Sequence, residues 1–357
     1  MILHPAALAL MLIALLVSGM GIYAGYYGIR ILRYWNPACG SEQQLELERR
    51  TYLISTIMSY ILSFELISLF LFIYTADDLH TLFTGAMCAA GTLAVNSFGY
   101  PTLLIKIINF VLAGIWLIVN YTDNRGYDYP LIRVKYILLT LIVPLLLLES
   151  FLLFAYFAGL KPDIITSCCG SLFSHESGGF SGDLASLPYR PTRIVFFICM
   201  AITVCSGLVF YVALTNRIRA LTGLFAAQEV QKMFSAILKC GGGYLFSIAA
   251  AVTFLVACAS VVSFICLYFY ELPTHHCPFC ILQKEYHYVG YLLYATLFGG
   301  AVAGIGAGVL LPFRKTGSLV RIIPDIQRRL VLITLVCYLL FTLITVWKMI
   351  FSALRLA

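Results

Sequence analysis

Long apolar runs separated by short polar stretches make up most of the chain. An α-helix needs about 20 mainly apolar residues to cross the hydrocarbon core of a bilayer. The pattern predicts eight such helices, at about 7–30, 52–75, 103–121, 136–158, 194–215, 242–270, 288–312 and 330–351. We therefore expect an all-α integral membrane protein, with 1–357 as a single polytopic membrane domain. Between its helices we expect an outer loop at 159–193 and an inner amphipathic segment at 216–240.

Three of the predicted hairpins share an order of features. Helices two, four and six each end in a run rich in aromatic residues, and a polar loop with cysteine follows each of them. The loop cysteines are Cys88, Cys168, Cys169, Cys277 and Cys280. This order suggests three copies of one outward helical hairpin, each placing cysteine at the same surface.

Composition agrees with a membrane location. The chain is 61% hydrophobic and only 11% charged, whereas a soluble domain usually carries about 25% charged residues. Most of the 23 Lys and Arg residues fall in one alternate set of loops. The positive-inside rule then places both termini outside a cell inner (plasma) membrane, with the Cys/His loops on the extracytoplasmic face. Because topology alone explains the basic residues, we expect a lipid bilayer and no nucleic acid as partner.

The outer loops contain cysteine and histidine side chains, which can bind metal ions or take part in redox reactions. Of the 12 cysteines, those named above lie in these loops, together with His80, His275, His276 and His287. An outer face is usually oxidising, so that thiols there tend to form disulfides or to bind metal. The spacing of Cys277 and Cys280 also lowers the pKa of the first thiol and makes it a better nucleophile.

The sequence around this pair carries a resemblance. Cys277-Pro278-Phe279-Cys280-Ile281-Leu282-Gln283-Lys284, followed by His287-Tyr288, resembles the C-P-x-C-x-x-Q-R-x-x-x-Y segment of the bacterial disulfide-bond oxidase family DsbB. The resemblance covers about 45 residues of the chain. In that family the C-x-x-C pair passes electrons from a substrate dithiol to a membrane quinone. The upstream position of the second cysteine pair is closer to the vitamin K epoxide reductase family.

The resemblance implies a membrane thiol–disulfide oxidoreductase. Cys277 and Cys280 would be the redox pair facing a quinone, and Cys168 or Cys169 would pass electrons from a periplasmic thiol protein. Lys284, Gln283 and His287 would form the quinone site. Lys284 stands where the family has arginine, and lysine cannot form the forked pair of hydrogen bonds that arginine forms.

Two other functions remain open on the same residues. Cys277 and Cys280, with Cys88, His80, His275 or His276, would satisfy a copper or zinc site. Alternatively, disulfide bonds between these cysteines cross-link the outer loops of a non-catalytic membrane subunit in an electron-transfer complex. The sequence disfavours haem, because Ile281 rather than histidine follows Cys280 and no histidine falls in the middle of a predicted helix.

Two further patterns concern the helices themselves. Glu65 and Glu149 lie inside apolar runs, where a carboxyl group is costly to bury, and we expect them to relay protons or to hydrogen-bond a neighbouring helix. Segment 86–102 begins with small residues and is expected to be re-entrant or tightly packed. Small residues at four-residue spacing over 299–308 predict close helix–helix contact, within the chain or with another subunit.

Overall fold

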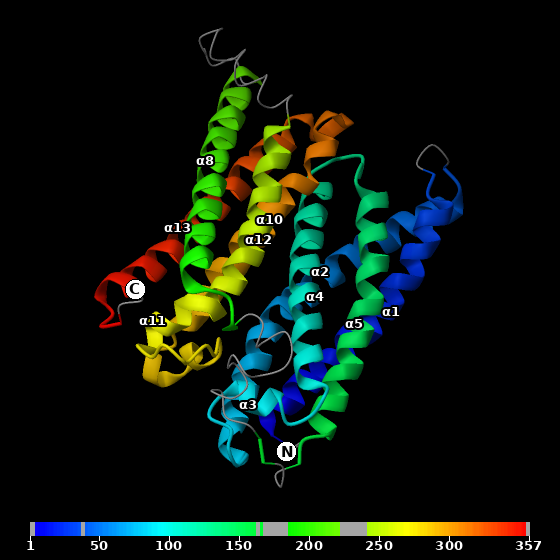
Figure 1. Cartoon of the computed structure of the whole chain (residues 1–357). Coiled ribbons are helices and arrows are strands. Elements are labelled where there is room, and N and C mark those ends of the chain that lie inside the picture. Colours follow the sequence, from blue (N-terminus) through cyan, green and yellow to red (C-terminus); the bar gives the residue numbers. More distant parts are fainter. Residues whose placement is uncertain (1–3, 37–39, 162–164, 167–184, 222–240, 355–357) are drawn as a thin grey trace. The chain divides into compact units, whose positions relative to one another are not determined.

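The structure is a computed structural model that describes residues 4–36, 40–161, 165–166, 185–221 and 241–354 (Figure 1). The described part of the chain is helical and contains no β-strand. It divides into two compact units, of which unit 1 comprises Met1–Thr84 and Thr92–Ile164. Unit 2 comprises Gly85–Gly91 and Ile165–Ala357, so a short segment between two helices of unit 1 belongs to unit 2.

Unit 1 is a bundle of four long helices. They are α1 (Pro5–Tyr34), α2 (Glu42–Asp78), α4 (Gly99–Asp123) and α5 (Ile132–Ala158). Helices α1 and α4 each pack against both α2 and α5, so the four helices form a closed ring. Its centre is filled by large apolar side chains, among them Met58, Trp116 and Tyr136. Burial of such side chains holds the bundle together, at roughly 1.5–3 kcal/mol for each one fully buried.

Unit 2 repeats this arrangement with α8 (Tyr189–Leu221), α10 (Gly242–Ser260), α12 (Val289–Val309) and α13 (Ile322–Phe351). Helices α8 and α12 each pack against both α10 and α13. The small residues of α12 permit this packing. A Cβ atom at Gly304 would lie 2.5 Å from the Cβ of Ala250, and one at Gly308 would lie 2.1 Å from the Oγ of Ser247. The predicted close contact over 299–308 is therefore confirmed, and it lies within unit 2.

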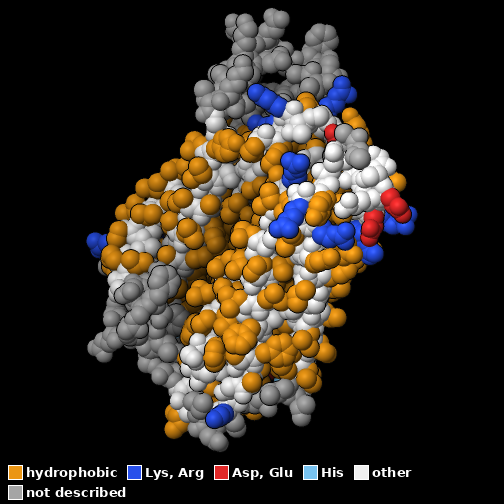
Figure 2. All heavy atoms as spheres, turned by 90° about the vertical axis from the view of Figure 1, so that its right-hand side faces the viewer, with side chains coloured by type: hydrophobic (Ala, Val, Ile, Leu, Met, Phe, Trp, Pro, Cys, Tyr) orange, Lys and Arg blue, Asp and Glu red, His pale blue; other side chains and the backbone are white. Residues whose placement is uncertain are grey.

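All eight long helices are apolar enough to cross a membrane. Their outward faces carry large apolar side chains such as Leu16, Leu255 and Leu343, each more than 60% exposed. Figure 2 shows hydrophobic side chains over most of one face, with Lys and Arg gathered mainly toward one end. Lipid rather than water suits such a surface. The protein is thus an all-α, multi-pass membrane protein, as the sequence predicted.

The grouping of the helices differs from the predicted hairpins. Helices α2 and α4 pair within unit 1, and α10 and α12 pair within unit 2, but α5 and α8 belong to different units. The helix contacts therefore form two sets of four helices, one set in each compact unit. The inner segment predicted at 216–240 lies almost wholly outside the described residues, as does most of the outer loop at 159–193.

Candidate functional site: a buried three-cysteine cluster

The C-x-x-C segment follows a helix that changes its winding before it ends. After α10 the chain forms a π-helical turn, η2 (Val261–Ile265), and then the short helix α11 (Cys266–Tyr270). Glu271 takes a left-handed conformation with φ 57° and ends the helix. Two short 3₁₀ turns, η3 (Cys280–Leu282) and η4 (Lys284–Tyr286), then lead into α12. The cysteine pair therefore lies in a compact loop at one end of unit 2.

Two tyrosines hold the backbone of this loop. The Tyr270 hydroxyl donates to the Cys277 carbonyl at 2.5 Å and accepts from the Ile281 amide at 2.9 Å. The Tyr294 hydroxyl, on α12, donates to the Pro278 carbonyl at 2.6 Å. Buried polar groups satisfied in this way fix the loop to the helices on both sides of it. The two thiols are thereby positioned by rigid elements before any ligand arrives.

A third cysteine, far away in sequence, completes the cluster. Cys88 lies in the 85–91 segment, and its Sγ is 3.5 Å from the Sγ of Cys277. The Sγ atoms of Cys88, Cys277 and Cys280 all lie within 4.8 Å of one another, and all three residues are buried. Thiols gathered this closely can share one metal ion or exchange disulfide bonds.

Polar contacts and one glycine hold the 85–91 segment in place. The Gln283 side-chain amide donates to the Met87 carbonyl at 2.8 Å, next to Cys88. Gly85 has a φ of 93°, a conformation that side chains rarely adopt. A Cβ atom there would also lie only 2.2 Å from the Thr166 carbonyl oxygen. Both the turn and the close approach therefore require glycine at this position.

Replacing Gly85 with alanine is expected to displace Cys88 from the other two thiols. The new methyl group meets backbone rather than a flexible side chain, so the segment itself must shift. We expect Gly85→Ala to reduce metal binding or thiol cross-linking at Cys88 at least ~10-fold, as loss of a supporting contact around a metal does. Cross-linking of Cys88 to Cys277 by a short bifunctional thiol reagent measures this. Gly19, whose Cβ would meet open space, provides the control Gly19→Ala.

The two neighbouring histidines have different surroundings. The Nε2 of His275 lies 3.4 Å from the Sγ of Cys280, and its ring stands edge-on to Tyr270. His276 is buried, and its Nδ1 lies 2.9 Å from the Val262 carbonyl in the π turn. His275 therefore lies beside the Cys280 thiol, and His276 connects the loop to the π turn of the preceding helix.

Charged and phenolic groups at the rim of the loop keep fixed protonation states. A hydrogen bond from the Lys348 ammonium, at 3.3 Å, lowers the pKa of the Glu271 carboxyl group. This contact ties the loop to the end of α13. Burial raises the pKa of Tyr286, whose ring packs against that of Tyr270. Near neutral pH Glu271 is thus anionic and Tyr286 is neutral.

The other predicted site residues are not gathered at the cluster. The side-chain amide of Gln283 contacts the Met87 carbonyl, and Lys284 and His287 are exposed. His80 belongs to unit 1, where its Nδ1 contacts the Asp77 carbonyl. Cys168 and Cys169 lie outside the described residues. Glu65 and Glu149 meet within unit 1, around Lys106.

Sequence reasoning missed the two tyrosines that hold the loop, as well as Lys106. Tyr270 and Tyr294 are among 23 tyrosines, and nothing in their spacing distinguishes them from interfacial aromatics. Comparison with protein-family models, with curated proteins and with solved structures finds no match to this chain. The resemblance to disulfide-bond oxidases therefore stays a prediction.

Proposed function

We propose that this multi-pass membrane protein binds a soft metal ion, zinc or copper(I), through the thiolates of Cys88, Cys277 and Cys280. The observation that supports this most is the mutual distance of at most 4.8 Å among the three sulfur atoms. In a tetrahedral zinc site with Zn–S bonds of about 2.3 Å, two sulfurs lie about 3.8 Å apart. The cluster needs to move its sulfurs by less than about 1 Å to reach that spacing.

The surroundings of the thiols determine which metals fit. His275 lies outside the set of groups that are within 4.8 Å of one another, but its Nε2 is 3.4 Å from the Cys280 sulfur. A shift of this side chain toward the other two sulfurs would make it the fourth ligand of a Cys₃His zinc site. Three thiolates without a fourth ligand suit copper(I). The Met87 side chain, next in sequence to Cys88, is 62% exposed and so is a poor candidate for a buried thioether ligand. The buried thiols and the adjacent imidazole thus favour zinc.

We place the cluster on the extracytoplasmic side of a cell inner membrane. Within unit 2, α12 begins beside the cysteine loop at Val289 and ends at Val309, and Arg314 and Lys315 follow it. Basic residues favour the cytoplasmic side, which assigns the opposite end of the helix to the outside. A soft-metal site there would serve metal binding or transfer at the outer surface.

Thiol oxidation is the second candidate function, and the 3.5 Å contact between the Cys88 and Cys277 sulfurs favours it. Two thiols there would lose two protons and two electrons and form one S–S bond. A membrane quinone that takes up both protons and both electrons would become a quinol. This reaction needs a dithiol substrate, a periplasmic thiol protein, to reduce the bond again.

Metal titration of the purified full chain, reduced and freed of metal by chelation, tests the proposal. We expect one Co²⁺ per chain, with a thiolate-to-cobalt charge-transfer band and the intense visible bands of a tetrahedral site. Zinc should displace the cobalt and protect the three cysteines from alkylation. Cys277→Ser and Cys280→Ser should weaken the band, whereas Cys205→Ser, an exposed cysteine on α8, should not.

A parallel measurement separates the two candidates. The metal-free protein is alkylated before and after addition of an oxidised quinone, and its disulfides are mapped by mass spectrometry. Stoichiometric metal without quinone-dependent disulfide formation supports the metal site. A quinone-dependent disulfide at Cys277, with no charge-transfer band from cobalt, would replace it with thiol oxidation.

A further inference from the structure

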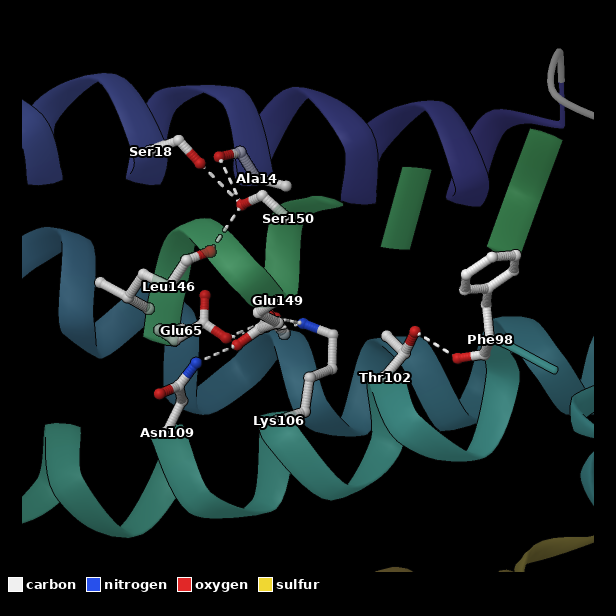
Figure 3. A network of polar contacts seen from close by, with 11 residues as sticks. Ala14, Ser18, Glu65, Phe98, Thr102, Lys106, Asn109, Leu146, Glu149 and Ser150 are labelled. Carbon is white, nitrogen blue, oxygen red and sulfur yellow. Dashed lines mark hydrogen bonds and ion pairs between the residues drawn. The ribbon is translucent and has the colours of Figure 1, made fainter. Parts of the chain in front are cut away.

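Unit 1 contains a buried cluster of charged groups that the cysteine site does not use. Glu65 on α2, Lys106 on α4 and Glu149 on α5 all point into the bundle (Figure 3). The Lys106 Nζ lies 2.5 Å from Glu149 Oε1, 3.5 Å from Glu65 Oε1 and 2.5 Å from the Ser68 hydroxyl. All three charged residues are at most 3% exposed. Lys106 lies about 10 Å along α4 from its first residue, Gly99, and is therefore inside the span.

The three groups do not balance in charge. With both carboxyl groups ionised, one ammonium leaves a net charge of −1 in a site closed to water. An uncompensated buried charge costs several kcal/mol, and buried groups avoid it by changing their protonation state. Because both carboxyl groups contact the same Nζ, they are near neighbours, and like charges at such range disfavour double ionisation. One bound proton would make the cluster neutral.

The hydrogen bonds indicate which carboxyl group takes that proton. Glu149 receives two short contacts, from Lys106 at 2.5 Å and from the Asn109 amide at 2.6 Å. Glu65 receives weaker ones, from the Ser68 hydroxyl at 3.2 Å and from Lys106 at 3.5 Å. Donors close to a carboxylate stabilise its ionised form. Glu149 should therefore stay ionised, while Glu65 holds the proton.

A second observation points to an exchangeable ligand at the same place. The Asn109 side chain is fully buried, and no donor in the described structure reaches its Oδ1, although its Nδ2 contacts Glu149. A buried carbonyl oxygen without a donor is rare, and it calls for a proton donor or a bound water. A carboxylic acid O–H, or a water that exchanges protons with it, would supply that donor.

Among the residues that the structure describes, the helices of unit 1 bring no other charged group to this cluster. Helix α1 has no acidic or basic residue between His4 and Arg30, and reaches α5 here through Ser18 and Ser150. The other buried ion pair, Asp123 with Lys135, lies near the far end of α4, about 25 Å along the helix from Lys106. Within the described part of unit 1, neutrality at the cluster therefore depends on these three side chains.

We infer that Glu65, Lys106 and Glu149 form a proton-binding site inside the membrane, which holds one exchangeable proton on Glu65. This adds a proton-carrying function in unit 1 to the thiol chemistry of unit 2. A static ion pair would leave no carboxylic acid to detect, whereas a proton-binding site must contain one.

Infrared spectroscopy of the full chain in lipid bilayers, from pH 5 to pH 9, tests this. The C=O stretch of a carboxylic acid is resolved from that of a carboxylate, and exposed carboxyl groups are ionised over most of this range. We expect one carboxylic acid per chain at neutral pH, which shifts on transfer to D₂O and disappears as the pH rises. Its absence over the whole range, or a band that neither shifts nor titrates, would overturn the inference.

Four variants test the charge balance. Glu65→Gln should abolish the band, and Glu149→Gln should also abolish it, because the remaining carboxyl group then pairs with Lys106 alone. Lys106→Met should double it, because both carboxyl groups must then be neutral. Glu46→Gln, at an exposed site of α2, should leave it unchanged. A band that persists in either glutamine variant contradicts the inference, and the doubling in Lys106→Met provides a test even if a glutamine variant does not fold.

Discussion

Replacing Lys135 with methionine is expected to destabilise unit 1 by about 3–5 kcal/mol, the usual cost of removing one partner of a buried ion pair. Its Nζ lies 2.6 Å from the Asp123 Oδ2, and both side chains are 0% exposed. The other carboxylate oxygen of Asp123 accepts from the Leu131 amide at 2.9 Å, so the pair also closes the connection between α4 and α5. Without the ammonium, Asp123 must stay charged and unpaired or take up a proton.

Denaturant unfolding of the purified chain in detergent measures this effect. Arg133→Met is the matched control, because it removes an exposed cation on the same turn of α5. The double variant Asp123→Asn/Lys135→Met should recover much of the lost stability, since no uncompensated charge remains. A loss in Lys135→Met no larger than in Arg133→Met would show that Asp123 is not a buried anion.

Replacing Cys88 with serine is expected to weaken metal binding by more than about 100-fold, because even loss of an outer partner of a metal ligand typically costs 10–100-fold. Cys88 is the discriminating position, since a site confined to the C-x-x-C loop would not use it. The affinity should also fall as the pH is lowered, because protons compete with the metal for the thiolates. Competition with a chromophoric chelator at two pH values measures both effects.

The matched control for Cys88→Ser is Cys337→Ser, a half-buried cysteine on α13 that is not part of the cluster. Equal affinities of Cys88→Ser and wild type would exclude Cys88 as a ligand. They would limit any metal site to Cys277, Cys280 and their neighbouring histidines.

Hydrophobic runs predicted the eight helices well but placed some of their ends badly. Helix α2 begins at Glu42, ten residues before the predicted 52, because Ser41 caps it and its polar first turns continue the helix beyond the apolar run. Helix α13 begins at Ile322 rather than 330 because its polar first turns also lie before the apolar run, although no side chain caps it. Hydropathy detects the lipid-facing part of a helix, whereas hydrogen bonds and caps decide where the helix stops.

The same limit explains the error at Lys106. The predicted span of 103–121 places Lys106 near its first turn, whereas the helix starts at Gly99 and carries the ammonium into the bundle. The sequence did single out Glu65 and Glu149, because acidic residues stand out in apolar runs. It could not show that they share one cation, since that contact joins three helices far apart in the chain.

The sequence predicted that the site would contain cysteine and histidine, but it could not predict which of the cysteines lie together. Spacing identified Cys277 and Cys280, and Cys88 was one of several candidates to join them. No periodicity connects residues 189 positions apart, and only the fold selects among such candidates. The sequence shows a glycine at position 85, but it does not show that this glycine has a positive φ and thereby positions Cys88.

The π turn at Val261–Ile265 has a consequence for how this span can change. A π turn gives a helix one residue more than an α-helical path of the same length requires. Removing one of these five residues would therefore restore the regular path and leave the helix beyond it in phase. Removing one residue from the α-helical part of α10 would instead rotate everything beyond the deletion by about 100°, and Tyr270 would then no longer face the Cys277 carbonyl. The π turn should therefore tolerate the loss of one residue better than the α-helical turns before it, so the length of this span can change there while the cysteine loop keeps its orientation.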